Sequence, residues 1–102
     1  MAVEKITKEN FDVLVKNSQK PVLLDFYADW CGPCRMVSPV VDEIAEERTD
    51  ILVGKINVDD DPSLAMEFGI VSIPTLTVME GGKAVQTAVG YRPKADILNL
   101  LK

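Results

Sequence analysis

Apolar and polar positions along the chain follow two different periods, and the change from one to the other predicts an order of strands and helices. A continuous apolar run at 21–27 is typical of a strand buried on both faces of a sheet. In the stretch 33–48 the apolar residues recur at helical spacing, opposite an acidic face. That stripe consists of Val37, Val40, Val41, Ile44 and Ala45. Because it is expected to be buried on both faces, 21–27 should be a central strand, followed by a long helix and then by a further strand at 51–58.

The N-terminal part has a weaker pattern of the same kind. Residues 3–6 form a short strand candidate. Thr7 is a candidate N-cap for a helix that ends at 17–18. The apolar residues at helical spacing in this helix are Phe11, Leu14 and Val15.

The C-terminal part predicts a hairpin between two helices. A short helix at 62–68 should stop at Gly69, where a left-handed cap is expected. Strands at 75–79 and 84–89 are joined by a turn with two glycines, which is the signal of an antiparallel hairpin. A last helix begins at Pro93 and turns Ile97, Leu98 and Leu101 toward the core.

This order of elements, βαβαβα followed by ββα, predicts an α/β fold with a central mixed sheet and helices on both faces. A chain of 102 residues without repeats or linkers suits a single domain, 1–102. Functional sites in open α/β sheets form beyond the carboxyl ends of strands. The pentapeptide after the strand 21–27 is expected at such a place.

Composition and charge restrict the class of partner. A net charge of −5 and a pI near 4.6, without a cluster of Lys and Arg, argue against binding of nucleic acid. No apolar stretch approaches the ~20 residues that span a bilayer, and the first residues do not resemble a signal peptide. We therefore expect a cytoplasmic protein with no membrane partner.

Both cysteines of the chain lie in the pentapeptide Trp30-Cys31-Gly32-Pro33-Cys34. Gly32 and Pro33 favour a tight turn into a helix, which lets the two thiols close into a disulfide. The free N–H groups and the positive dipole end of a helix start stabilise a thiolate. We expect Cys31 to be the nucleophile and Cys34, one turn inside, to resolve a mixed disulfide while being less open to outside attack.

Two other uses of this cysteine pair compete with redox chemistry. As a structural staple, so short a loop would contribute only about 2 kcal/mol. A structural zinc site wants four ligands, but the chain has no histidine and no second cysteine pair. Persistent structural disulfides are also uncommon in a reducing cytoplasm. Redox cycling is therefore the favoured interpretation, and no metal site is expected.

Asp25 is an acid inside the apolar run 21–27, either solvated at a strand end or buried. Burial is the better interpretation, and it would raise the pKa of the carboxyl by disfavouring its charged form. Such a group could exchange a proton with Cys34, directly or through one water. Lys55, in the strand 51–58, is either a rim residue or a central one that needs a carboxylate partner, for which Asp25 is the candidate.

Two further features have a structural and a functional interpretation. Pro39 should kink the long helix, and the kink either helps to aim the first turn or is a tolerated bend. The run Asp59-Asp60-Asp61 looks like a cation site, but its spacing does not match a calcium loop. An aspartate before Pro62 is instead typical of a helix N-cap.

The sequence resembles the thioredoxin family over nearly its whole length. The residues that carry the resemblance are Trp30 to Cys34, Asp25, Pro39, Lys55, Ile73-Pro74-Thr75 and Gly90. The chain departs from the usual family residues at Tyr27, Arg35 and Ser72, and its last helix ends early. None of these departures touches the sulfur chemistry directly.

The resemblance implies a thioredoxin-like fold in which Pro74 is cis and lies beside the dithiol. The backbone of Ile73 would pair with an extended segment of the substrate, which is recognition by addition of a β-strand. The apolar rim around it would consist of Trp30, Pro33, Val58, Ile73, Pro74, Val89 and Gly90. Substrate choice should then be broad.

The resemblance also implies the reaction: a thiol-disulfide oxidoreductase that reduces disulfides in target proteins through Cys31 and Cys34. Gly32-Pro33 looks like the dipeptide of the reducing members. A thioredoxin reductase would restore the dithiol, and the flavin and NADPH would belong to that partner, so no cofactor is expected in this chain, which should be a monomer. The rival interpretation is a binding module that uses the same rim without sulfur turnover.

Overall fold

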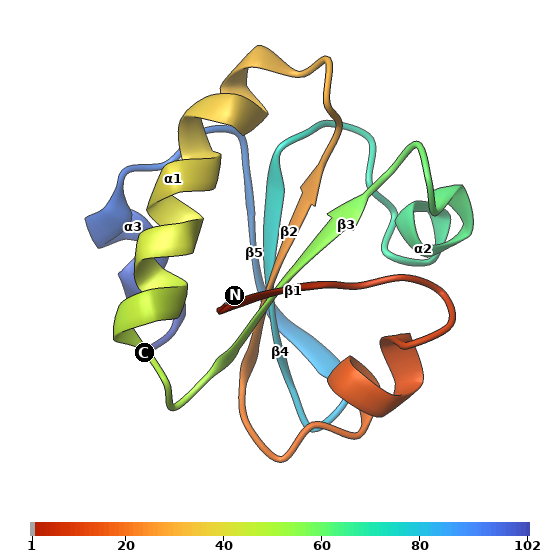
Figure 1. The fold of residues 1–102 in the computed structure, drawn as a ribbon, viewed down its shortest axis with the longest axis vertical. Helices are drawn as coiled ribbons and strands as arrows, with labels where there is room; N and C mark the ends of the chain where they lie inside the picture. The colour runs from red at the N-terminus through yellow and green to blue at the C-terminus, as the bar shows by residue number, and fades with distance from the viewer. Residues whose placement is uncertain (1) are drawn as a thin grey trace.

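A five-stranded mixed sheet forms the centre of the computed structural model, which describes residues 2–102 (Figure 1). The strands are β1 (Val3–Lys5), β2 (Val22–Tyr27), β3 (Leu52–Asn57), β4 (Thr75–Glu80) and β5 (Lys83–Val89). Their order across the sheet is β1-β3-β2-β4-β5. The first three strands are mutually parallel, whereas β4 runs antiparallel to β2 and to β5. The predicted central position of β2 and the predicted hairpin are confirmed.

Helices cover both faces of this sheet. The helices are α1 (Gly32–Glu47), α2 (Pro62–Glu67), α3 (Lys94–Leu100) and a short π-helix, η1 (Asp12–Lys16). Figure 1 shows α1 and α3 together on one side of the sheet, with α2 and η1 on the other. The amino group of Lys94 donates to Glu43 and Glu47 at 2.5 and 2.8 Å and so joins α3 to α1. The predicted α/β class is confirmed.

Each face of the sheet has its own apolar core, and β2 contributes to both. Leu23 packs with α1 and α3, whereas Leu24 and Phe26 pack with residues of η1 and α2. Because successive side chains of a strand point to opposite faces, Asp25 shares the face of Leu23. The carboxyl is therefore directed toward the layer that contains α1.

The segment between β1 and η1 differs from the expectation. Thr7 is not a helix N-cap: η1 begins after Phe11, without a side-chain cap. The side chain of Asn10 instead bonds the backbone of the preceding segment, accepting from Thr7 N at 2.8 Å and donating to Lys5 O at 2.9 Å. Such local bonds of an Asn side chain compete with helix formation, which explains the late start. The predicted apolar residues still pack inward from this segment.

The remaining elements begin and end close to the predicted residues. Asp61 occupies the N-cap position of α2, as expected, and its backbone carbonyl accepts from Leu64 N and Ala65 N, but its side chain makes no cap bond to this helix. Its carboxylate accepts from Lys8 N at 3.1 Å and so ties the loop after β1 to α2. Gly81 and Gly82 both have positive φ, as the hairpin turn requires. Pro39 lies inside α1, and its kink stays a prediction.

Among residues 2–102, the helices include none that could cross a bilayer.

Gly54 provides a test of packing at the centre of the sheet. A Cβ at this position would lie 2.5 Å from Ile6 Cγ1 and 3.3 Å from Leu24 Cδ2. Gly54→Ala should therefore lower the free energy of unfolding by about 1–3 kcal/mol through overpacking. Urea unfolding of the oxidised protein measures this. Gly32→Ala is the matched control, since its Cβ meets nothing within 4 Å. Equal stability of both variants would contradict the packing argument.

Candidate active site

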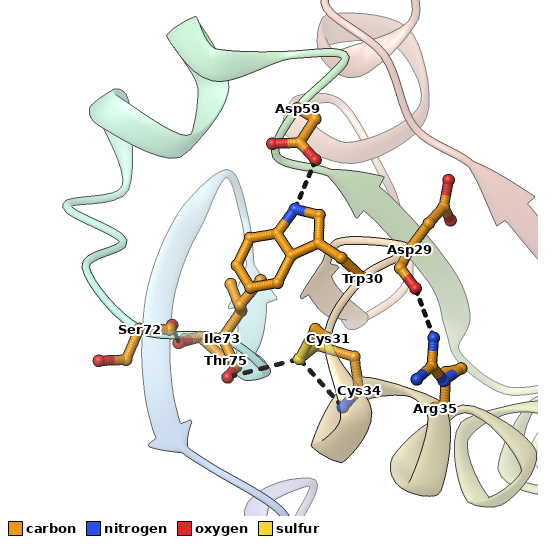
Figure 2. Close-up of a disulfide and its surroundings, with 9 residues drawn as sticks. All are labelled: Asp29, Trp30, Cys31, Cys34, Arg35, Asp59, Ser72, Ile73 and Thr75. Carbon is orange, nitrogen blue, oxygen red and sulfur yellow. Dashed lines mark hydrogen bonds between the residues drawn. A yellow bond between two sulfur atoms is a disulfide. The ribbon is translucent and has the colours of Figure 1, made fainter.

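The two cysteines lie where the chain passes from the central strand into α1, and they form a disulfide (Figure 2). Cys31 is the N-cap residue of α1, and Pro33 lies in the first turn. The Cα atoms of Cys31 and Cys34 are 5.2 Å apart. The tight turn that the sequence predicted therefore exists, at the carboxyl end of β2.

The first turn of α1 directs a backbone donor at the sulfur of Cys31. Cys34 N donates to Cys31 Sγ at 3.2 Å, and the carbonyl oxygen of Ile73 lies 3.8 Å from the same sulfur (Figure 2). After reduction, this N–H and the positive end of the helix would stabilise negative charge on Cys31. The expected reason for reactivity is thus present in the geometry.

Exposure does not separate the two sulfur atoms, although we expected Cys34 to be the less open one. The exposed fractions are 4% for Cys31 and 3% for Cys34. Their surroundings differ instead: Cys31 lies beside Ile73, while Cys34 lines a pocket of about 310 Å³ together with Ser38 and Lys55. Cys34 is therefore the cysteine that shares a pocket with titratable groups of the sheet.

The peptide bond between Ile73 and Pro74 is cis, as the resemblance implied. Gly90 N donates to Pro74 O at 2.8 Å, and Thr75 Oγ1 donates to Ser72 O at 2.6 Å. These bonds hold the loop in place before β4. As a result, Ile73 packs against the two cysteines.

An apolar surface pocket of about 190 Å³ lies next to this loop. Of the expected rim, it brings together Trp30, Val58 and Ile73. Trp30 is 68% exposed, and its indole N–H donates to Asp59 at 2.9 Å (Figure 2). The pocket is also lined by residues that sequence reasoning missed: Ala65, Ile70, Val71 and Ser72.

A signal for the missed residues exists in the sequence. Ile70 and Val71 are apolar residues in a loop, directly after Gly69, where no helix or strand period demands them. Val71 is 95% exposed, so it does not serve the core. Two other expected rim residues lie at the end of β5: Val89 is its last residue, and Gly90 follows it and is bonded to the proline loop.

Asp25 is fully buried, and neither of its carboxyl oxygens has a hydrogen-bond partner within residues 2–102. Burial raises the pKa of this carboxyl from 3.8 to about 7, because removal from water disfavours the charged form. The positive charge of Lys55 lowers the pKa and the negative charge of Asp42 raises it, both to a smaller extent. The predicted burial and the predicted direction of the shift are confirmed.

Lys55 lies in the inner strand β3 but does not form an ion pair with Asp25, its candidate carboxylate partner. The two residues are direct neighbours in the parallel pairing of β2 with β3. The amino group of Lys55, however, donates to Ser38 Oγ at 2.5 Å and lies 5.1 Å from the centre of the Tyr27 ring. A hydroxyl and an aromatic face therefore take the place of the carboxylate.

Sequence reasoning missed Ser38 as part of the site. Its signal is its spacing: it lies four residues after Cys34 in α1, and residues four apart share one face of a helix. Within residues 2–102, no three His, Cys, Asp or Glu side chains are grouped as metal ligands.

The chain is similar to known proteins over nearly its full length. A family model described as Thioredoxin matches residues 2–102. The thioredoxin of Pyropia yezoensis is 53% identical over 102 residues, which cover 99% of this chain and 95% of that protein. Thioredoxin 1 of Synechococcus elongatus is 50% identical over 97 residues, or 94% of this chain and 91% of its own. The thioredoxin of Mycobacterium tuberculosis is 50% identical over 101 residues, with 98% and 87% covered.

The pKa of Asp25 predicts how stability depends on pH. Between pH ~4 and ~7 the folded protein keeps the Asp25 proton while the unfolded chain releases it. Stability from this group is therefore complete at low pH and is lost as pH rises through this window, by roughly 4 kcal/mol. Asp25→Asn should remove this fall, which urea unfolding of the oxidised protein from pH 4 to 8 measures.

A surface variant serves as the control for this titration. Asp60→Asn removes an exposed carboxyl and should leave the fall in stability intact. If Asp25→Asn showed the same pH dependence as the unmodified protein, the fall in stability would not come from the raised pKa of Asp25.

Proposed function

The chain belongs to the thioredoxin family, and from this premise we propose how its residues carry out the family's reaction. It is a thiol-disulfide oxidoreductase that reduces disulfides in target proteins through the reversible Cys31–Cys34 pair, and a reductase restores its dithiol. The observation that carries this function is the disulfide at the start of α1, with a backbone N–H directed at Cys31 Sγ.

In the proposed first step, the Cys31 thiolate attacks one sulfur of a target disulfide. A bond forms between Cys31 and that sulfur, the target disulfide breaks, and the other target sulfur leaves as a thiolate that takes up a proton. Cys34 then loses its proton and attacks Cys31. The Cys31–Cys34 disulfide forms, the second target thiol is released, and two electrons have passed to the target. The close approach of the two cysteines supports this second step.

We propose that Asp25 accepts the proton that Cys34 loses. A carboxyl with a pKa of about 7 is half ionised near neutrality, which suits a group that both accepts and returns a proton. Within residues 2–102 its oxygens have no hydrogen-bond partner, and Lys55, its neighbour in the strand pairing, lines the same pocket as Cys34. We expect the proton to pass directly or through one water. In this scheme Lys55 supplies the positive charge that limits the rise of the Asp25 pKa.

Targets would bind as an extended segment along the Ile73 loop. The exposed apolar side chains of Trp30 and Val71 and the pocket between them favour a target with an apolar residue next to its cystine. Backbone pairing with Ile73 would be indifferent to the target's sequence. Pro33, Pro74, Val89 and Gly90 complete this proposed surface. Recognition should accordingly be broad.

For the remaining partners, we propose a thioredoxin reductase with flavin and NADPH as the electron donor, a monomeric working state and a location in the cytoplasm. The family match over 2–102 supports a single domain for this chain. The apolar rim is assigned to targets, which leaves a monomer as the simplest state.

Replacement of the resolving cysteine tests the reaction. Cys34→Ser should trap a disulfide substrate such as insulin as a mixed disulfide with Cys31, because release needs the second thiol. Non-reducing electrophoresis and mass spectrometry detect the adduct. Cys31→Ser is the matched control and should trap none. Binding of partners without any covalent adduct would favour the binding module instead.

The acid/base role of Asp25 has a kinetic test. Asp25→Asn should slow release of the mixed disulfide at neutral pH by about a hundredfold, while initial attack by Cys31 changes little. Single-turnover measurements that follow Trp30 fluorescence can separate the two steps. A release rate equal to that of the unmodified protein at every pH would refute this role.

A further inference from the structure

The position of the Lys55 amino group is unusual for a lysine beside a buried acid. It donates to Ser38 Oγ at 2.5 Å, and its charge lies over the ring of Tyr27. Asp25, its neighbour in the paired strands, keeps two carboxyl oxygens without a hydrogen-bond partner within residues 2–102. An ammonium that could approach a carboxylate is therefore bonded to a hydroxyl of α1.

Among residues 2–102, the other elements around Asp25 do not offer a replacement cation. Its β4 neighbour is the apolar Leu76, and α1 contributes the negative charge of Asp42 and, after reduction, the Cys34 thiol. Tyr27 lies two residues along the same strand. On β1, Lys5 is exposed, and its amino group pairs with Asp60 at 3.9 Å. The location of the Lys55 ammonium consequently decides whether Asp25 has an opposite charge in contact.

We propose that Ser38 is a positioning residue: its hydroxyl holds the Lys55 ammonium away from Asp25, which leaves the carboxyl unpaired and able to accept the Cys34 proton. This inference rests on the proposed acid/base role of Asp25. A contact ion pair would favour the charged carboxylate and make it a weaker base. Ser38 thereby preserves a protonatable carboxyl beside a lysine.

The geometry of α1 explains why residue 38 can do this. Ser38 lies one helical turn after Cys34, and both residues line the pocket of about 310 Å³ together with Lys55. The Ser38 side chain is therefore on the face of α1 that overlies the sheet. Alanine at this position would remove the hydroxyl and keep a residue that favours a helix.

The test is the pKa of Asp25 in the oxidised protein, measured by NMR titration of its labelled carboxyl carbon. Ser38→Ala should free the ammonium to approach the carboxylate and lower this pKa by about one unit. The pH midpoint for release of the mixed disulfide should move in the same direction. Ser38→Thr keeps a hydroxyl and should leave both values close to those of the unmodified protein.

The same substitution in a variant without Lys55 distinguishes a positioning role of Ser38 from a general disturbance of the site. In Lys55→Met there is no ammonium to release, so adding Ser38→Ala should cause no further fall in the Asp25 pKa. An unchanged or raised pKa in Ser38→Ala, or the same fall without Lys55, would overturn the proposal. The titration involves no turnover, so a negative result would overturn the role of Ser38 only. The acid/base role of Asp25 is tested separately, by the kinetics of Asp25→Asn.

Discussion

Burial of β2 on both faces is the constraint on which the rest of the structure depends. The strand lies between β3 and β4, with one apolar core on each side. A carboxyl placed in such a strand is removed from bulk water, and its pKa rises because the ionised form loses hydration. The same strand ends directly before the cysteines. One buried strand thus carries a carboxyl with a raised pKa and leads directly into the two cysteines.

Strand pairing brings the second half of the site to the first. In the antiparallel pairing of β2 with β4, Phe26 lies opposite Thr75. The residues just before Thr75 must therefore lie across from those just after Phe26, and this is where Ile73 meets Cys31. The disulfide and the proposed target-binding loop share one end of the sheet because two strands that run in opposite directions meet there.

The pKa of Asp25 depends on how far the Lys55 ammonium lies from its carboxyl. Full pairing of Asp25 with Lys55 would favour a carboxylate at neutral pH, whereas removal of the lysine would leave burial and Asp42 to raise the pKa further. Lys55 lies in the adjacent strand and is bonded to α1, so its charge lowers the pKa of Asp25 less than a contact ion pair would. Catalytic acids and bases are commonly tuned toward the working pH in this way, by burial and by charges held at a distance.

The sequence by itself determined the strands, the long helix, the hairpin, the dithiol and the burial of Asp25, because each depends on residues that are close along the chain. A helix stripe, a Gly-Gly turn or an acid in an apolar run is a local signal. Only the tertiary structure decided the partners of polar side chains: Asp61 bonds Lys8 rather than α2, and Lys55 bonds Ser38 rather than Asp25. These partners come from distant segments, and which of them wins depends on distances that appear only once helices and sheet are packed together.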